Sequence, residues 1–336
     1  IVVLSGIGLA MVYRPIIPGA FQSVEHLQTS FPLGWWLRGI HKYGCDLLII
    51  FAALRLIRMM YRRAYKPPGH TTWIMAIAIF AVAIVSGLTG YLLVWNERAF
   101  FEGRLLGSGT IFYEQAYPLG GMGIPLSVIQ IFTGGNQITQ RCLTSIYAVH
   151  IGLSVLVLLI ALRWRTIGWQ RSPKHRAFEP AVSRRLIWTL IGILTLLALI
   201  FPPPLGSPQD GILKIHPVLA DWFMLSFYQF AKIISSGAGV FLILLALILS
   251  LALPWLDMSK VRGPHPVVSS IIIAALACSI FSTAGFLWGW NSPILLLIGI
   301  VAIWVIIPGF GIWLSVRENR EKHVDEVEGE KEVAAE

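Results

Sequence analysis

Long apolar runs alternate with short polar connections along the whole chain. A helix needs about 20 apolar residues to cross a hydrocarbon layer about 30 Å thick. All of these runs except the first are long enough, so the pattern predicts an all-α polytopic membrane protein. The runs cover residues 1–13, 36–58, 73–95, 142–164, 184–201, 235–254, 266–287 and 291–315.

The first run, 1–13, is too short to span a bilayer. It opens inside an apolar stretch, with no Met and no basic segment before it. We interpret it as the end of a longer helix and not as a signal peptide.

Composition agrees with a membrane protein. Hydrophobic residues make up 56% of the 336 residues and the mean hydropathy is +0.73, which a soluble domain of this length could hardly carry. The net charge of +9 does not point to nucleic acid, because the cations cluster in short connections. By the positive-inside rule these connections face the negative side of the membrane, here the N side. The clustered cations are Arg55, Arg58, Arg62, Arg63, Lys66, Arg163, Arg165, Arg171, Lys174, Arg176, Arg184, Arg185, Lys260 and Arg262.

The opposite face, here the P side, then receives the long connections 14–35, 96–141 and 202–234. Long loops in compact proteins often carry function, so we expect the functional chemistry there. The tail from Arg317 is highly charged and lacks an apolar face. It is predicted to be a solvated helix or a disordered segment on the N side.

The three cysteines, Cys45, Cys142 and Cys278, stand singly in or beside apolar runs. This placement is typical of packing residues. The chain has no C-x-x-C-H motif, which argues against covalently attached haem.

Two histidines suggest a cofactor. His41 lies near the P-side end of run 36–58, and His150 lies about nine residues into run 142–164, which starts from the same side. In a helix bundle their imidazoles would face each other at similar depth, as in bis-histidine ligation of a b-type haem. One such histidine could be an ordinary core residue, but two at matched depth in a bilayer favour function. Gly6 and Gly90 fall near the same face and serve either a haem plane or ordinary helix packing.

A series of motifs follows in a fixed order along nearly the whole chain. They read LSGIGLAMVYRP, AFQSVEHL, GWWLRGIHKYG, TTW, GLTGYLLVW, FTGG, LTSIYAVHIG, PPPLG, LADWFMLSFYQF and LALPWLDMS. In order and spacing this series resembles cytochrome b of the cytochrome bc complexes. The resemblance implies an eight-helix subunit whose first four helices hold two b haems, one near each membrane face.

The resemblance also assigns residues. It implies that His41 and His150 are the axial ligands of the P-side haem, with Gly6 and Gly90 against the ring and Arg38 near a propionate. It implies a haem-binding four-helix bundle over 1–165, a four-helix region with the P-side quinone loop over 166–316, and a charged N-side tail over 317–336.

The chain departs from this family at the N-side haem. Arg55 and Trp164 stand at the two ligand positions, and Ala76 replaces a glycine. Because both ligand positions and the glycine position have changed together, we expect the N-side haem to be absent. Arg55 either fills the vacated cavity as a functional charge or snorkels to the headgroups, and Trp164 reads as an interfacial anchor.

Two further N-side histidines, His70 and His175, could ligate a displaced haem. Both are expected in basic, Pro-containing loops rather than in helices, which makes this reading the weaker one.

The P-side quinone pocket is also altered. Where the family has Pro-Glu-Trp-Tyr, this chain reads Ala-Asp-Trp-Phe, and Asp221 retains an acid that is one methylene shorter. Quinol oxidation needs a base near a hydroxyl and an apolar slot, which Asp221, Trp222, Phe223 and Tyr228 could provide. Equally, Asp221 could cap a loop helix among interfacial aromatic residues.

Two other departures touch quinone chemistry. The VWN sequence that ends at Asn96 replaces Leu-Pro-Trp-Gly near the P-side pocket. At the N-side quinone site, Pro173 and Lys174 stand where the family has an Asp-Lys pair, so quinone reduction by the family mechanism is not expected there.

These observations predict an electron-transfer subunit of a cytochrome bc-like complex, in a bacterial cytoplasmic membrane. It would bind one P-side haem b and exchange electrons between quinol and a Rieske iron-sulfur protein or c-type cytochrome, as part of a quinol-oxidising complex without a complete Q-cycle. The alternative is a degenerate cytochrome b that anchors other redox subunits or pairs with an intact second cytochrome b. A transporter is a distant third, because no inverted repeats are evident.

Overall fold

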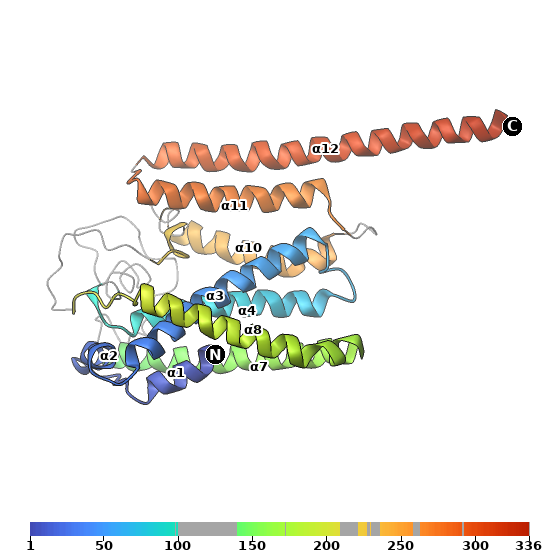
Figure 1. Cartoon of the computed structure of the whole chain (residues 1–336). Helices are drawn as coiled ribbons and strands as arrows, with labels where there is room; N and C mark the ends of the chain where they lie inside the picture. The colour runs from blue at the N-terminus through green and yellow to red at the C-terminus, as the bar shows by residue number, and fades with distance from the viewer. Residues whose placement is uncertain are drawn as a thin grey trace. The chain divides into compact units, whose positions relative to one another are not determined.

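The computed structural model describes residues 1–97, 99, 140–171, 173–208, 221–226, 229, 236–257, 263–290 and 292–335. Every apolar run predicted from the sequence is helical within these residues, so the predicted all-α fold is confirmed. The helices are α1 (Val2–Ala10), α2 (Gly19–Thr29), α3 (Gly34–Tyr61), α4 (His70–Leu92), α7 (Gln140–Arg171), α8 (Pro173–Ile200), α10 (Ser236–Leu256), α11 (Pro266–Leu287) and α12 (Pro293–Ala335) (Figure 1).

Four of these helices are long and apolar enough to cross a membrane: His70–Leu92, Gln140–Arg163, Pro266–Leu287 and Ile294–Glu318. Helix α3 has sufficient length, but charged residues recur along it, among them Arg38, Asp46 and Arg55. Charges at these intervals are costly in hydrocarbon unless they are paired or reach the interface. The predicted helix at 36–58 is therefore confirmed, but α3 is less apolar than the four helices named above.

The chain divides into two compact units. The first unit comprises Ile1–Arg55, Ile74–Ala220 and Ser235–Ser250, and the second comprises Leu56–Trp73, Asp221–Ile234 and Leu251–Glu336. Each unit is described separately below.

In the first unit, the chain around α2 is fastened to the beginning of α7 and the end of α4. The Gln140 side chain donates to the Pro15 carbonyl at 2.6 Å and accepts from the Ile17 amide at 2.8 Å. The Tyr13 hydroxyl donates to the Leu93 carbonyl at 2.8 Å, and Leu93 packs in a buried cluster with Ala20 and Leu143. These contacts bring α1, α2, α4 and α7 together at one end of the unit.

Helices α3 and α8 approach closely in the same unit. A Cβ atom at Gly39 would lie 2.4 Å from the Ala198 Cβ, so only glycine permits this approach. The Trp36 indole also donates to the Thr195 hydroxyl at 3.0 Å. Helix α3 is thereby held in place along the turns that carry His41.

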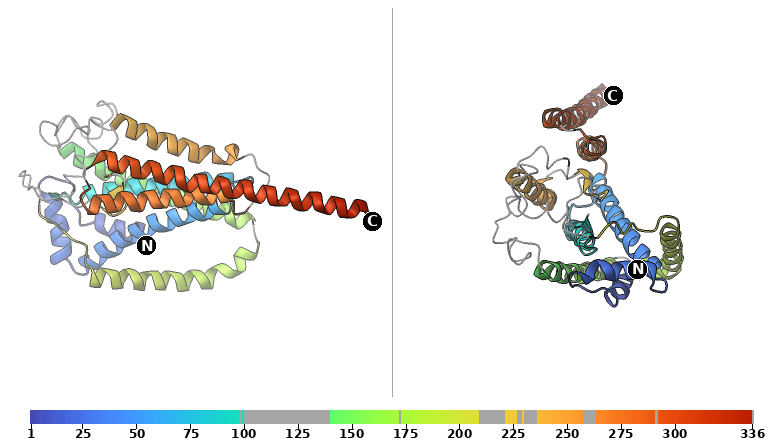
Figure 2. Two further views of the ribbon diagram at one scale, coloured as in Figure 1. Left: turned by 90° about the horizontal axis from the view of Figure 1, so that it is seen from above. Right: turned by 90° about the vertical axis from the view of Figure 1, so that its left-hand side faces the viewer.

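In the second unit, α11 and α12 form a helix pair. Figure 1 and the left view of Figure 2 show them side by side, with α12 continuing beyond α11. Glycines permit the contact: a Cβ at Gly311 would lie 2.1 Å from the Ser270 Oγ, and one at Gly299 would lie 2.3 Å from the Phe281 ring. The charged tail continues α12 as helix to Ala335, which is the helical one of the two predicted alternatives.

Candidate functional site

His41 on α3 and His150 on α7 lie opposite each other in the first unit. Their ring centroids are 6.3 Å apart and their planes cross at 72°. Both side chains are half-buried. The structure thus brings together the two histidines that the sequence singled out.

Each ring is anchored through Nδ1. His41 Nδ1 lies 3.1 Å from the Ser5 Oγ and 3.0 Å from the Val2 carbonyl oxygen, both on α1. His150 Nδ1 lies 3.0 Å from the Thr89 Oγ1 on α4. Helices α1 and α4 therefore orient the rings that α3 and α7 carry.

Gly6 and Gly90 lie directly against the two rings. A Cβ at Gly6 would be 3.0 Å from the His41 Cε1, and a Cβ at Gly90 would be 3.0 Å from the His150 Cε1. This distance is tighter than ordinary van der Waals contact, so a side chain at either position would displace the imidazole. Each glycine leaves room for the ring of a histidine on the neighbouring helix.

The spacing of the two rings fits one metal between them. A metal–imidazole bond is about 2.0 Å long and the ring centroid lies about 1.1 Å behind the nitrogen, so two imidazoles on opposite sides of one metal have centroids about 6.2 Å apart. The observed separation is 6.3 Å. Both Nδ1 atoms are engaged elsewhere, and His41 Nε2 lies 4.0 Å from the Cys45 Sγ, a weak contact. Nε2 is therefore the nitrogen that would bind a metal on each ring. The residues present therefore fit a bis-histidine haem.

Arg38, which the resemblance places near a propionate, contacts the segment that follows α8. Its guanidinium donates to the Pro203 carbonyl at 2.8 Å and to the Pro204 carbonyl at 2.9 Å, and it also contacts the Gln28 side-chain oxygen. Asn96 fixes the same segment from the other side by donating to the Leu205 carbonyl at 2.7 Å. Arg38 and Asn96 therefore hold the PPPLG segment in the first unit.

The residues at the expected N-side haem positions form no comparable arrangement within the described part of the chain. Arg55 is exposed and Ala76 is 2% exposed. Trp164 lies in α7, but its side chain is outside the described residues.

The prediction that His70 and His175 lie in loops is wrong. His70 is the first residue of α4, and His175 lies in the first turn of α8. Proline explains both starts: Pro67 and Pro68 cannot continue a helix, whereas Pro173 suits the first helical position.

In the second unit, Asp221 begins a short turn. Its backbone carbonyl accepts from the Met224 and Leu225 amides at 2.8 and 3.1 Å, and the residue is only 5% exposed. The neighbouring Trp222 and Phe223 rings meet edge to face at 5.6 Å. Ala220 and Tyr228, the other predicted pocket residues, lie outside the described residues.

Three hydrogen bonds attach this turn segment to the α11 region of the same unit. The Ser226 hydroxyl donates to the Ser279 carbonyl at 3.0 Å and lies 2.9 Å from the Thr283 hydroxyl, and the Gln229 amide donates to the Trp290 carbonyl at 3.0 Å. The segment that begins with Asp221 is thus held by α11 and the residues that follow it.

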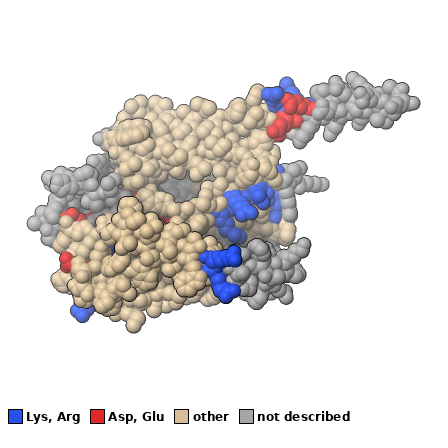
Figure 3. All heavy atoms as spheres, in the orientation of Figure 1, with Lys and Arg blue, Asp and Glu red and all other residues tan. Residues whose placement is uncertain are grey.

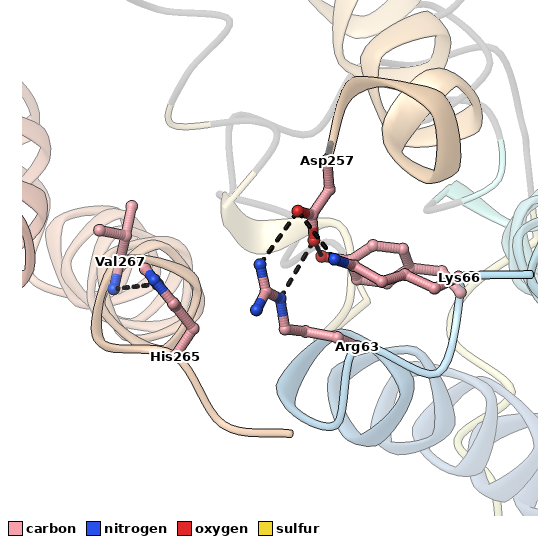
Figure 4. A network of polar contacts seen from close by, with 6 residues as sticks. Arg63, Lys66, Asp257, His265 and Val267 are labelled. Atoms are coloured by element: carbon pink, nitrogen blue, oxygen red, sulfur yellow. Dashed lines mark hydrogen bonds and ion pairs between the residues drawn. The ribbon is translucent and has the colours of Figure 1, made fainter. Parts of the chain in front are cut away.

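A buried ion cluster lies elsewhere in the second unit (Figure 4). Arg63 donates to both Asp257 carboxylate oxygens at 3.0 Å, Lys66 pairs with the same carboxylate at 3.0 Å, and the Tyr65 hydroxyl donates to it at 2.7 Å. Arg63 and Lys66 are 4% and 7% exposed. Burial, together with this hydrogen bond, raises the pKa of Tyr65 to about 12. The cluster joins the α3–α4 connection to the end of α10.

Figure 3 shows one face, with basic side chains over the end of α3 in the second unit and a separate basic group over α7 and α8 in the first unit. The helix surfaces between the ends of each unit are almost entirely uncharged on that face. This distribution agrees with the basic connections seen in the sequence.

Comparison with known proteins gives a consistent result. Residues 1–166 match the family described as Cytochrome b/b6/petB, and residues 208–307 match Cytochrome b(C-terminal)/b6/petD. Cytochrome b of Rickettsia prowazekii is 27% identical over 78% of this chain and 69% of that protein, and cytochrome b of Arabidopsis thaliana is 26% identical over the same shares. A chain of a hyperthermophilic respiratory Complex III superposes with a TM-score of 0.69 over 94% of this chain and 88% of that chain, at 19% identity.

The apolar helices and the matched family define an integral membrane protein of electron transport. The chain belongs to the cytochrome b family, as the two matched regions and the relatives show. Membership implies haem b as the cofactor and electron transfer as part of a cytochrome bc-type complex.

Sequence reasoning missed four polar residues that shape these clusters. Ser5 and Thr89 contact the histidine rings, yet each looks like an ordinary helix residue beside a glycine. Tyr65 and Asp257 form part of the ion cluster, although almost 200 residues separate them in the chain. For Ser5 and Thr89 the sequence did contain a signal, because each of them directly precedes one of the two glycines Gly6 and Gly90.

Proposed function

We propose that this cytochrome b binds a single haem b on the P side, between His41 and His150, and exchanges electrons between quinol and a P-side redox partner. The observation that carries the proposal is the pair of imidazoles at 6.3 Å, each anchored through Nδ1. A haem bound there supplies a one-electron carrier. The chain's own contribution is to hold both ligands in position within an apolar bundle.

The replaced residues support one haem rather than two. Arg55 and Trp164 stand at the other ligand positions, and Ala76 stands where a haem plane would require glycine. An electron on the P-side haem then has no second haem to relay it across the membrane. We infer that the chain does not run a complete Q-cycle by itself.

Asp221 is our candidate for the proton acceptor in quinol oxidation, with Trp222 and Tyr228 lining the ring slot. Support comes from the burial of Asp221 beside the aromatic pair of Trp222 and Phe223. A carboxylate in apolar surroundings is suited to taking a proton from a quinol hydroxyl. We expect Asp221→Asn to lower quinol oxidation by about 100-fold and Asp221→Glu to retain most of it, measured as haem reduction by quinol.

The partner on the P side would be a Rieske iron-sulfur protein or a c-type cytochrome, and the membrane would be a bacterial cytoplasmic membrane. Support comes from family membership and from the fold shared with a chain of a respiratory Complex III. Basic connections at one end of the helices set the orientation by the positive-inside rule.

A second candidate function is a structural one. The changed residues at the N-side haem positions and the altered Asp221 motif also suit a degenerate cytochrome b that anchors redox subunits or pairs with an intact copy. In that role His41 and His150 would carry no haem.

A pyridine haemochrome assay separates the two candidates. The proposal predicts that the purified chain contains haem b and that His41→Ala and His150→Ala each abolish it, because one histidine cannot replace the other. Ser154→Ala, which changes α7 one turn from His150 without removing a ring contact, should retain the haem. Haem retained in either histidine variant would overturn the ligand assignment, and no haem in the wild-type chain would favour the structural role.

A further inference from the structure

Helices α1 and α4 carry the same short pattern around their ring-contacting glycines. In α1, Ser5 directly precedes Gly6, and in α4, Thr89 directly precedes Gly90. In α1 the Val2 backbone carbonyl, three residues before Ser5, also reaches the facing His41. The pattern that occurs twice is a hydroxyl residue followed directly by a glycine.

Each copy of the pattern meets one histidine through its hydroxyl and its glycine. On α1 the contacts to His41 are the Ser5 Oγ at 3.1 Å and the Gly6 position at 3.0 Å from Cε1, with the Val2 oxygen at 3.0 Å in addition. On α4 the contacts to His150 are the Thr89 Oγ1 at 3.0 Å and the Gly90 position at 3.0 Å from Cε1. In both copies the hydroxyl oxygen faces Nδ1 and the glycine faces Cε1.

The direction of these hydrogen bonds fixes the proton on the His41 ring. A carbonyl oxygen only accepts, so the nitrogen that faces the Val2 carbonyl must donate. The Ser5 hydroxyl has one proton and has the Val2 and Ile1 carbonyls as acceptors, at 2.9 and 3.1 Å, so its oxygen can accept from His41 Nδ1–H. The Thr89 hydroxyl likewise has the Val85 and Ser86 carbonyls as acceptors for its proton, at 2.9 and 3.0 Å. We assign the same direction to the Thr89 contact with His150 Nδ1.

We propose that these two segments are a duplicated holder for the axial histidines, in which Ser5 and Thr89 are positioning residues that keep the proton on Nδ1 and fix the plane of each ring. The inference rests on the proposed haem site and extends it. Both rings, whose planes cross at 72°, would then hold the haem iron through Nε2. The glycine of each holder makes room for the ring, and the hydroxyl sets its rotation.

The holders have an electronic consequence. A hydrogen bond from Nδ1–H makes an imidazole a stronger electron donor through its other nitrogen, which favours ferric over ferrous iron. Removing one acceptor should therefore raise the reduction potential of the haem. It should also free the ring to rotate, so that the angle between the two planes changes.

The test uses the full-length chain purified in detergent, and it measures haem per chain, reduction potential by redox titration, and the largest g value of the ferric haem in its electron paramagnetic resonance spectrum. The variants are Thr89→Val and Ser5→Ala, which remove a hydroxyl. Ser154→Ala is the matched control, because its hydroxyl bonds the His150 backbone carbonyl at 2.9 Å rather than the ring. Thr89→Ser restores the hydroxyl without the methyl group.

We expect Thr89→Val to raise the reduction potential of the haem by up to about 59 mV, which for one electron is a tenfold change in the ferric-to-ferrous equilibrium. We also expect it to lower the largest g value. Ser5→Ala should shift both readouts in the same direction, whereas Thr89→Ser and Ser154→Ala should match the wild type. If Thr89→Val loses haem outright, the proposal still requires Thr89→Ser to keep it.

Two results would overturn the holder. One is a normal potential and g value in both hydroxyl-deleted variants, and the other is a Thr89→Ser variant as impaired as Thr89→Val. Either result leaves the haem site itself standing, because haem per chain is measured in every sample. Absence of haem from the wild-type chain would instead refute the proposed function.

Discussion

The two units each contain a cluster of polar side chains, and the clusters differ in what completes them. In the first unit, His41 and His150 engage Nδ1 with the protein, and in the proposed function Nε2 of each ring would bind a metal. In the second unit, the charges of Arg63, Lys66 and Asp257 pair with one another. On this proposal the histidine cluster is completed by a cofactor, whereas the ion cluster is completed by the chain itself.

This difference separates function from stability. Removing a histidine should cost the cofactor and leave most of the fold, because the ring makes few other polar contacts. Removing the Asp257 carboxylate should destabilise the fold, because the buried cations Arg63 and Lys66 would lose its negative charge. Mutations can therefore tell the clusters apart by what is lost.

The largest effect on stability should come from Asp257→Asn. Because Arg63 and Lys66 are 4% and 7% exposed, loss of the carboxylate should lower the free energy of unfolding by about 3–5 kcal/mol. Denaturant unfolding in detergent measures this change. The haem content of the folded fraction should stay normal, so haem loss without destabilisation would contradict the division of roles.

A smaller effect is expected at the glycines. Gly90→Ala places a Cβ 3.0 Å from the His150 Cε1, so the ring must shift and haem affinity should fall by about tenfold. Gly152→Ala is the matched control, because nothing lies within 4 Å of a Cβ there. Haem titration of the two variants compares them directly, and equal affinities would show that the close contact does not matter.

Alkaline pH should weaken the ion cluster through Tyr65. Its pKa is raised from 10 to about 12 in the folded chain, so the unfolded chain ionises first and stability falls as pH rises from 10 to 12. Tyr65→Phe should show a shallower fall over the same range, measured by unfolding at each pH. An unchanged slope would exclude Tyr65 as the group responsible.

The smallest effect should be seen at an exposed ion pair. Arg317 and Glu321 lie 2.8 Å apart, but their side chains are 61% and 60% exposed. Glu321→Gln should therefore change the free energy of unfolding by less than about 0.5 kcal/mol. A loss comparable to that of Asp257→Asn would mean that burial does not govern the difference between the two pairs.

The sequence predicted the helices and the histidine pair for clear physical reasons. Apolar runs of spanning length are a strong signal for helices. The similar depth of His41 and His150 in their helices predicts that the two imidazoles face each other. The predicted starts of α4 and α8 are wrong because the neighbouring prolines were interpreted only as loop residues. Proline also suits the first turn of a helix.

The ion cluster could not be predicted in the same way. Arg63 and Asp257 are far apart in sequence, and nothing local to either residue specifies the other. Positive charges near the end of a membrane helix are ordinarily solvated, so burial of Arg63 and Lys66 depends on tertiary packing. The roles of Ser5 and Thr89 likewise depend on which helix each one faces.

The central claim is that the chain carries one haem, between His41 and His150. Counting haem b against protein in the purified wild-type chain, by pyridine haemochrome absorbance and quantitative amino-acid analysis, tests it most directly. The account predicts one haem per chain. Two haems per chain would contradict it, because Arg55 and Trp164 would then not mark a lost site.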